Sequence, residues 1–180
     1  MRLLLLLLPL LLPLLPLLFL LPFSDGGGLI EQTCKLTPFP DLCLSALHSS
    51  PGSSSTDLHG LAGIMANSVL QNANQTLDQI QQLLDRSPAD PETEHSLAYC
   101  AELYIPVVKY NLPQAIDALS KGRLGFAAYA INDAVNEAQE CEKKLSGGSE
   151  SLSQVSDRNK IVTNMAAVAL AIIKVLQKGF

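Results

Sequence analysis

Four cysteines are the residues of this 180-residue chain best suited to covalent chemistry. All of them follow an apolar N-terminal segment typical of export, and an even set of cysteines in an oxidising compartment predicts disulfides before metal binding or catalysis. Three pairings are possible. Cys34 and Cys43 flank a proline-rich turn, which favours the pair Cys34–Cys43. Cys100 and Cys141 fall on two later helical segments and form the second favoured pair.

Other catalytic or metal-binding patterns are weakly marked. Only Cys43 and His48 have a spacing like that of zinc ligands, and surface histidines explain this pattern better. No Gly-x-Ser-x-Gly elbow and no phosphate-binding loop is present. The acids that could form the carboxylate pair of glycoside hydrolysis, and that are better explained as solvated helix positions, are Glu92, Glu94, Glu137, Glu140 and Glu142. The sequence therefore predicts a protein that is not an enzyme and uses no cofactor or metal.

One N-glycosylation acceptor is present, Asn74-Gln75-Thr76. It lies within a segment of helical periodicity, so a glycan on Asn74 would mark an outward face. In the alternative, Asn74 is an unmodified polar helix position and Thr76 is turned toward the core.

The N-terminal residues have the composition of an export signal. Residues 3–23 are rich in leucine and residues 24–28 are small, so we expect a signal peptide over 1–26 that is cut between 24 and 28. A membrane anchor is the alternative, because about 20 apolar residues span a bilayer. Four prolines interrupt this stretch, however, and would cost helix hydrogen bonds.

The charge of the chain argues against nucleic acid as a partner. Twelve Lys and Arg residues face 17 Asp and Glu residues, for a formal net charge of −5, and no dense basic run is present to neutralise a phosphate backbone. After signal removal about 150 residues remain, which is enough to bury a core without a cofactor.

Helical periodicity dominates the remaining chain. A short hairpin over 29–48 is broken by the prolines of residues 37–40, and a Ser- and Gly-rich linker follows at 49–56. Four longer helices are then expected, covering 58–87, 91–121, 127–145 and a region after the loop 146–150. Pro106 and Pro113 should kink the second of these helices.

Apolar residues three and four positions apart predict the buried face of each helix. An all-α, antiparallel up-down-up-down four-helix bundle buries all four faces, and it would bring the second and third helices side by side. The residues expected inside are Leu58, Leu61, Met65, Val69, Ala73, Thr76, Ile80 and Leu83; Leu97, Cys100, Tyr104, Val107 or Val108, Leu112, Ile116 and Leu119; Ala127, Ile131, Ala134, Ala138, Cys141 and Leu145; and Ile161, Met165, Val168, Ile172 and Val175.

The connection between the second and third helices, residues 120–126, has an unusual composition. Lys121 and Arg123, two glycines and Phe126 occur together in an acidic protein. As structure, Phe126 would staple the first turn of the third helix against the core. As function, an apolar anchor flanked by cations suits an acidic cleft, where burial gives affinity and charge gives steering.

The segment IEQTCKLTPFPDLCL, residues 30–44, closely resembles the N-terminal hairpin of the plant invertase and pectin methylesterase inhibitor family. The resemblance continues through 99–101, 112–122 and 138–142, and it covers the whole mature chain. It implies a helical hairpin on a four-helix bundle and the same two cysteine pairs. We therefore expect an inhibitor domain over 29–178, with the hairpin at 29–48 and the bundle at 56–178.

Members of this family block acid invertases, which hydrolyse sucrose, or pectin methylesterases, which demethylate pectin, by occluding the active-site cleft. Residues 120–126 and 138–142 look more like the invertase-inhibitor branch. In that branch a Pro-Lys-Phe motif reaches the invertase active site, and Leu124-Gly125-Phe126 aligns with it. Only Phe126 matches, although Lys121 and Arg123 keep positive charge nearby.

The resemblance thus implies a secreted inhibitor of acid invertase, or β-fructofuranosidase, that forms a 1:1 complex in the apoplast or cell wall, or in the vacuole. It implies no contact with a membrane after signal cleavage. The alternative target is pectin methylesterase, which such inhibitors bind through a broader face of the helices. A stand-alone enzyme and the pro-region of a larger pectin methylesterase are less favoured. The expected target-binding residues are Lys121, Arg123, Leu124, Gly125 and Phe126.

Overall fold

The structure is a computed structural model that describes residues 28–86, 90–145 and 150–179. The signal peptide expected over 1–26 and its cleavage site lie outside these residues, apart from Gly28 at the end of the cleavage range. The described elements are α3 (Leu29–Cys34), α4 (Pro40–His48), the 3₁₀ turn η2 (Ser53–Ser55), α5 (Leu58–Asp85), α6 (Pro91–Pro106), the π-helix η3 (Val107–Asn111), α7 (Leu112–Ser120), α8 (Leu124–Leu145) and α9 (Glu150–Lys178).

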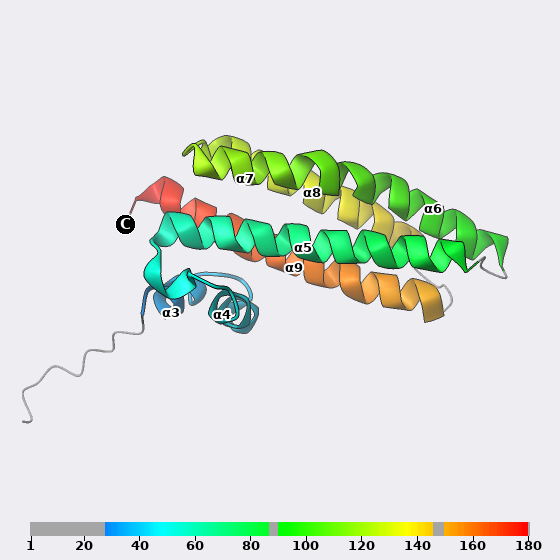
Figure 1. Ribbon diagram of the computed structural model, residues 1–180, viewed down its shortest axis with the longest axis horizontal. Coiled ribbons are helices and arrows are strands. Elements are labelled where there is room, and N and C mark those ends of the chain that lie inside the picture. The colour runs from blue at the N-terminus through cyan, green and yellow to red at the C-terminus, as the bar shows by residue number, and fades with distance from the viewer. Residues whose placement is uncertain (1–27, 87–89, 146–149, 180) are drawn as a thin grey trace, which may run out of the picture.

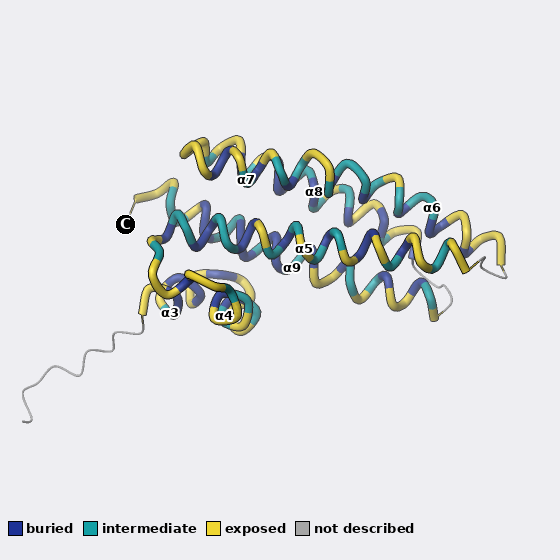
Figure 2. The backbone as a smooth tube through the Cα atoms, viewed as in Figure 1, coloured by how far each residue is buried: buried dark blue, intermediate teal, exposed yellow. Residues whose placement is uncertain are grey.

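The four long helical rods alternate in direction, as the up-down-up-down prediction requires (Figure 1). α5 packs beside α9, and α8 packs between α9 and the rod formed by α6, η3 and α7. The α3–α4 hairpin lies against α5 and α9, on the side away from α7 (Figure 1). Buried residues face the interior of this arrangement along each rod (Figure 2). The all-α bundle with an N-terminal hairpin is confirmed.

Two aspartates begin long helices. The Asp57 carboxylate accepts a hydrogen bond from the Gly60 amide at 2.8 Å and caps α5. Asp90 caps α6 by accepting from the amide and the hydroxyl of Thr93, at 2.9 and 2.7 Å. These bonds to Thr93 hold the pKa of the Asp90 carboxyl below its usual value. Each cap satisfies amides that the first helical turn leaves without partners.

The two prolines of the second rod bracket the π-helix η3. The Leu112 amide donates to the Val107 carbonyl, five residues earlier, because the segment accommodates one more residue per turn than an α-helix. The buried face therefore steps from Val107 to Leu112 and continues through Ala115 and Ala118. Ile116, which plain helical periodicity placed inside, is only half-buried.

The predicted inner face of α9 is partly wrong. The helix begins at Glu150, and Ile161 is 42% exposed, whereas the adjacent Val162 is buried. From the sequence, either Ile161 or Val162 could have faced the core. The buried hydrogen bonds of Asn159 decide between them, because they turn the side of α9 that carries Asn159 and Val162 inward. Met165, Val168 and Ile172 are buried as predicted. The last residue predicted inside on α5, Leu83, and the last on α9, Val175, are only half-buried.

Among the described helices, α9 is the one long and apolar enough to cross a membrane. Its most apolar positions pack against α5 and α8, and Val168, Ala169 and Ile172 have no exposed surface. A bundle helix that is covered by more than one neighbour needs this composition. Its hydrophobicity is therefore explained by the bundle core.

Both favoured cysteine pairs form disulfides. Cys34–Cys43 closes the hairpin, with Cα atoms 5.4 Å apart. Cys100–Cys141 joins α6 to α8, with Cα atoms 4.8 Å apart. The second bond links positions 41 residues apart, so it restricts the unfolded chain more than the first.

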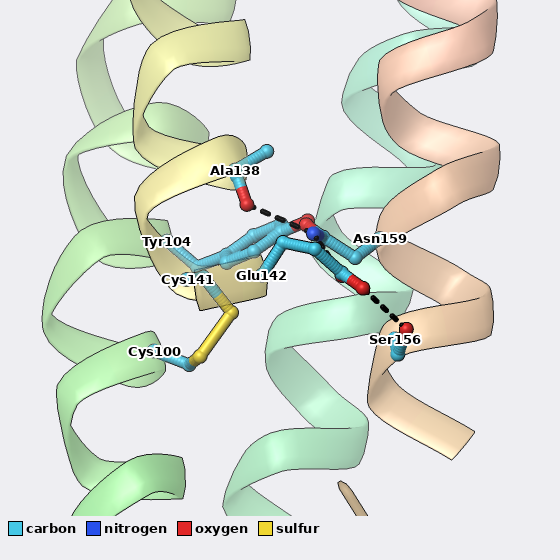
Figure 3. Close-up of a disulfide and its surroundings, with 7 residues drawn as sticks. All are labelled: Cys100, Tyr104, Ala138, Cys141, Glu142, Ser156 and Asn159. Atoms are coloured by element: carbon cyan, nitrogen blue, oxygen red, sulfur yellow. Dashed lines mark hydrogen bonds between the residues drawn. A yellow bond between two sulfur atoms is a disulfide. The ribbon is translucent and has the colours of Figure 1, made fainter. Parts of the chain in front are cut away.

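A buried polar network lies beside the Cys100–Cys141 bond and ties three helices together (Figure 3). The Tyr104 hydroxyl donates to Asn159 Oδ1 at 2.5 Å. Asn159 Nδ2 donates to the Ala138 carbonyl at 2.8 Å and to Glu142 Oε2 at 2.7 Å, and Ser156 Oγ donates to Glu142 Oε1 at 2.6 Å. Burial raises the pKa of the Tyr104 hydroxyl, and the Glu142 carboxylate raises it further. Tyr104 therefore remains a neutral donor.

Candidate target-binding site at the α7–α8 turn

The turn between α7 and α8 is shorter than its sequence indicates, because Leu124, Gly125 and Phe126 form the first turn of α8. Gly122 adopts φ +67° and donates its amide to the Leu119 carbonyl at 2.9 Å. The Arg123 amide donates to the Ala118 carbonyl at 2.8 Å. These two bonds form a Schellman motif, which satisfies the last carbonyls of α7 and fixes the direction of the exit. Glycine suits position 122 because side chains rarely tolerate this left-handed conformation.

Asp117 holds both cations of the turn. Its carboxylate lies 2.7 Å from Lys121 Nζ and 3.0 Å from Arg123 Nη2. The hydrogen bond from Lys121, assisted by the charge of Arg123, holds the pKa of the Asp117 carboxyl below its usual value. The trio therefore carries a net charge of about +1 rather than two free cations. The sequence carried a signal for this role, since Asp117 and Lys121 are four positions apart on one helix.

Phe126 points outward rather than into the core. Its side chain is 48% exposed, and the Arg123 guanidinium carbon lies 5.7 Å from the centre of its ring. Leu124 instead packs partly against the core. The structural alternative, in which Phe126 staples the first turn of α8 to the interior, is therefore wrong. A cation over an aromatic ring is attracted to its face, so Arg123 and Phe126 order one another at the surface.

Two exposed tyrosines that sequence reasoning missed lie on neighbouring elements, Tyr129 on α8 and Tyr110 on η3. Tyr129 follows Phe126 by one turn of α8 and is 68% exposed. Tyr110 of η3 is 60% exposed. Next to Tyr110, the Asn111 amide donates to Asp133, one turn beyond Tyr129, and joins η3 to α8. We call Tyr110, Phe126 and Tyr129 the aromatic face. Its signal in the sequence is the spacing of three between Phe126 and Tyr129.

The weaker candidates for chemistry do not form a site. Cys43 is bonded to Cys34, and His48 Nε2 lies 3.2 Å from a carboxylate oxygen of Glu31 in the hairpin. Within residues 28–86, 90–145 and 150–179, no group of three His, Cys, Asp or Glu side chains could hold a metal ion. Burial, together with the charges of Asp133 and Glu140, raises the pKa of Glu137. The acids that sequence reasoning considered lie at separate helix positions, Glu92 and Glu94 beginning α6 and Glu137, Glu140 and Glu142 on α8.

Comparison with known proteins shows which family the chain belongs to. Residues 28–172 match the family model described as plant invertase/pectin methylesterase inhibitor. The chain belongs to this family of proteinaceous inhibitors. An Arabidopsis thaliana relative named cell wall / vacuolar inhibitor of fructosidase 1 is 35% identical over 82% of this chain and 72% of its own length. A pectinesterase inhibitor from Actinidia deliciosa is 28% identical over 82% of this chain and 79% of its own.

The fold of this family member also agrees with a solved structure. A crystal structure of a mutant form of a pectin methylesterase inhibitor from Arabidopsis superposes with a TM-score of 0.71. The match covers 83% of this chain and 97% of that chain at 24% identity. At this identity the likeness concerns the fold alone, and it supports the helical hairpin and bundle.

The possible glycosylation position of this inhibitor lies in the middle of α5. Asn74 is half-buried, and its Nδ2 donates to the Leu70 carbonyl at 2.9 Å. Thr76 is buried and donates to the Asn72 carbonyl at 2.8 Å, as expected if Asn74 were an ordinary helix position. Modification of Asn74 stays a prediction.

Proposed function

We propose that this family member inhibits an acid invertase, or β-fructofuranosidase, by placing the α7–α8 turn in the active-site cleft. The observation that carries the proposal is the exposed Arg123–Phe126 pair on a rigid turn, in a chain 35% identical to a named inhibitor of fructosidase. The inhibitor forms a 1:1 complex, catalyses no reaction and needs no cofactor.

Binding by this turn combines burial with charge. Transferring an exposed aromatic side chain into a desolvated pocket contributes about 2 kcal/mol or more, so Phe126 is the anchor. Lys121 and Arg123 approach acidic groups of the target and raise the rate of encounter. Asp117 restrains both cations before binding, which reduces the entropy lost when they are immobilised.

Leu124 and Gly125 are the weak part of the match to the Pro-Lys-Phe motif. Neither supplies the fixed φ of proline or a central cation. In this chain the Schellman motif at Gly122 supplies rigidity, and Arg123 supplies the charge nearest to Phe126. We therefore propose that the family's binding mode is retained with a different distribution of charge.

Localisation follows from the same relationship. The similar Arabidopsis protein is named a cell wall / vacuolar inhibitor, and residues 1–26 have the composition of a signal peptide. We propose that the mature chain, with its inhibitor domain at 29–178, is secreted to the apoplast or cell wall, the vacuole being the alternative. Both disulfides suit an oxidising compartment.

Pectin methylesterase is the second candidate target, and the aromatic face favours it. Tyr110 and Tyr129 give the bundle a broad exposed surface beyond the turn, and the Actinidia deliciosa relative is named a pectinesterase inhibitor. An interface built on helix faces would need neither the proline nor the lysine that Leu124 and Gly125 replace.

Titration of the oxidised chain, starting at Gly28, into acid invertase and into pectin methylesterase at mildly acidic pH tests both candidates. Stoichiometric loss of sucrose hydrolysis, with pectin demethylation unaffected, is the expected result. Loss of pectin demethylation alone would reject invertase as the target. The aromatic face would then be the surface proposed to bind pectin methylesterase. Turnover of sucrose or pectin by the purified chain itself would contradict its role as an inhibitor.

A further inference from the structure

A polar groove lies between α5 and α9, at the end of the bundle opposite to the α7–α8 turn (Figure 1). Its volume is about 430 Å³, within the range of small-molecule sites. One leucine and seven polar or charged side chains line it: Gln75, Asp78, Gln79, Gln82, Leu83, Arg86, Gln154 and Arg158. Two of the seven are cationic and one is anionic, in a chain whose net charge is −5.

Arg158 is half-buried in this groove and is held by neutral groups. Its Nε donates to Gln79 Oε1 at 2.8 Å, and Nη1 donates to Gln75 Oε1 at 3.0 Å. None of the ion pairs formed by the described residues includes Arg158. The two amide oxygens accept from two of its five N–H groups without neutralising its charge, so the groove retains a positive potential.

The arginine also fixes the direction of the neighbouring amides. A guanidinium has no acceptor, so the oxygens of Gln75 and Gln79 must turn toward it. The amide nitrogen of Gln79 then donates to Gln154 Oε1 at 3.3 Å, which leaves the nitrogen of Gln154 as a donor. In all three bonds a glutamine oxygen accepts from another side chain of the groove. These amides and the guanidinium therefore present N–H donors to a ligand.

We infer that this groove binds a carboxylate that carries hydroxyl groups, such as a sugar acid. The amide donors of Gln75 and Gln154 and the guanidinium of Arg158 suit the carboxylate, since charge-assisted bonds to arginine are the stronger ones. Asp78 supplies an acceptor for hydroxyl groups, and Arg86 supplies a second cation. The ligand is either a free sugar acid or the same unit within an acidic polysaccharide.

This inference stands apart from the proposed inhibition. The groove residues lie on the α5–α9 side of the far end of the bundle, whereas Phe126 lies at the opposite end on α8. Substitutions in the groove are expected to leave inhibition of either target enzyme unchanged. Failure of one proposal is therefore distinguishable from failure of the other.

Nuclear magnetic resonance titration of the oxidised chain tests the groove. The probes are D-galacturonate, its neutral methyl ester and trigalacturonate, and the signals are the side-chain amide resonances of Gln75, Gln79 and Gln154. D-galacturonate is expected to shift these resonances, and the methyl ester, which keeps the hydroxyls but lacks the charge, is expected to bind about tenfold or more weakly. Tighter binding of trigalacturonate would identify the polysaccharide as the source, and equal binding would identify the free acid.

Three variants locate the site. Gln79→Glu places a carboxylate against Arg158, so it should abolish binding while leaving the fold as stable as before. Arg158→Gln should abolish binding by removing the cation. Lys160→Gln is the matched control, because it makes the same change in charge on the same helix but outside the groove. Absence of shifts in the wild-type chain at millimolar probe, or equal binding by Gln79→Glu, would overturn the inference.

Discussion

At the scale of single residues, the feature with the most direct consequence is the outward position of Phe126. Its ring is held by Arg123 and by the first turn of α8, so little conformational freedom remains to be lost on binding. An anchor on a helix is also placed more precisely than one on a loop.

Phe126→Ala should therefore weaken inhibition by about tenfold or more, since anchors of this kind contribute about 2 kcal/mol. Phe39→Ala is the matched control, because Phe39 is a phenylalanine of comparable exposure, 38%, in the hairpin. Inhibition constants and thermal unfolding of both variants provide the measurement. Full inhibition by Phe126→Ala would remove the assigned anchor.

The double variant Leu124→Pro, Gly125→Lys restores the Pro-Lys-Phe motif and should strengthen inhibition of invertase. Leu124 is the first residue of α8, where proline is favoured, and a Cβ at Gly125 would meet nothing within 4 Å. Replacing a helical glycine should also stabilise α8 by about 0.5–1 kcal/mol. Inhibition assays against both enzymes provide the measurement. Unchanged inhibition of invertase would contradict a role for this motif in the present chain.

Glu137→Gln should stabilise the protein at neutral pH. Burial and the charges of Asp133 and Glu140 raise the pKa of the Glu137 carboxyl, so its charged form is less favourable in the folded state than in the unfolded state. This penalty applies at pH values above the raised pKa and disappears as the carboxyl becomes protonated. The variant should unfold at a higher temperature than wild type at pH 7 and at the same temperature below pH of about 4. A difference that stays constant across this range would show that ionisation of Glu137 is not its cause.

At the scale of secondary-structure elements, the buried polar network determines how α9 faces its neighbours. Tyr104, Asn159 and Glu142 bring α6, α9 and α8 into one register (Figure 3). A purely apolar contact at this position would tolerate rotation of α9, whereas hydrogen bonds require particular partners.

Tyr104→Phe should lower the free energy of unfolding by about 1–3 kcal/mol, because Asn159 Oδ1 would lose its buried donor. Tyr129→Phe removes the same hydroxyl from an exposed ring, and its effect should stay within about 0.5 kcal/mol. Urea unfolding of the two variants provides the comparison. Equal stabilities would mean that the network contributes nothing to the packing of α9.

Periodicity predicted six buried positions of α8 correctly, among them Ala127, Ile131 and Ala134, because they recur at steps of three and four; it missed Ala130, which is also buried. It misplaced Ile161 because Val162 is equally apolar and only tertiary hydrogen bonds distinguish the two positions. It placed Ile116 inside, whereas α7 turns Leu112, Ala115 and Ala118 inward and leaves Ile116, partly buried, beside the core.

The candidate site was predictable in its composition but not in its arrangement. Residues 120–126 stood out from the sequence, and Asp117 could have been added from its spacing to Lys121. The outward position of Phe126 and the link between Asn111 and Asp133 depend on how η3 and α7 pack against α8, which no local pattern contains.

At the scale of the whole molecule, the bundle separates its features along its length. The α7–α8 turn lies at one end, while the polar groove lies toward the other (Figure 1). The Cys100–Cys141 bond joins two rods of this bundle, whereas Cys34–Cys43 acts within the hairpin alone.

Replacing Cys100 and Cys141 by serine should lower the free energy of unfolding by about 4 kcal/mol, compared with about 3 kcal/mol for the Cys34 and Cys43 pair. The difference arises because the loops that they close span 41 and nine residues. Urea unfolding of the two double variants under oxidising conditions measures both values. A larger loss for the hairpin pair would show that native packing, and not loop length, decides these contributions.

The π-helix between the two prolines makes the second rod tolerant of changes in length. It absorbs one residue while α6 and α7 keep their inner faces toward the core. Deleting the exposed Lys109 would convert the segment into an ordinary α-helical turn, and α7, Gly122 and Phe126 would stay in phase with the bundle. In a relative whose η3 segment is one residue shorter, the residues before and after the segment would therefore still correspond to those of this chain. The length of this segment can drift during evolution without moving the turn that follows.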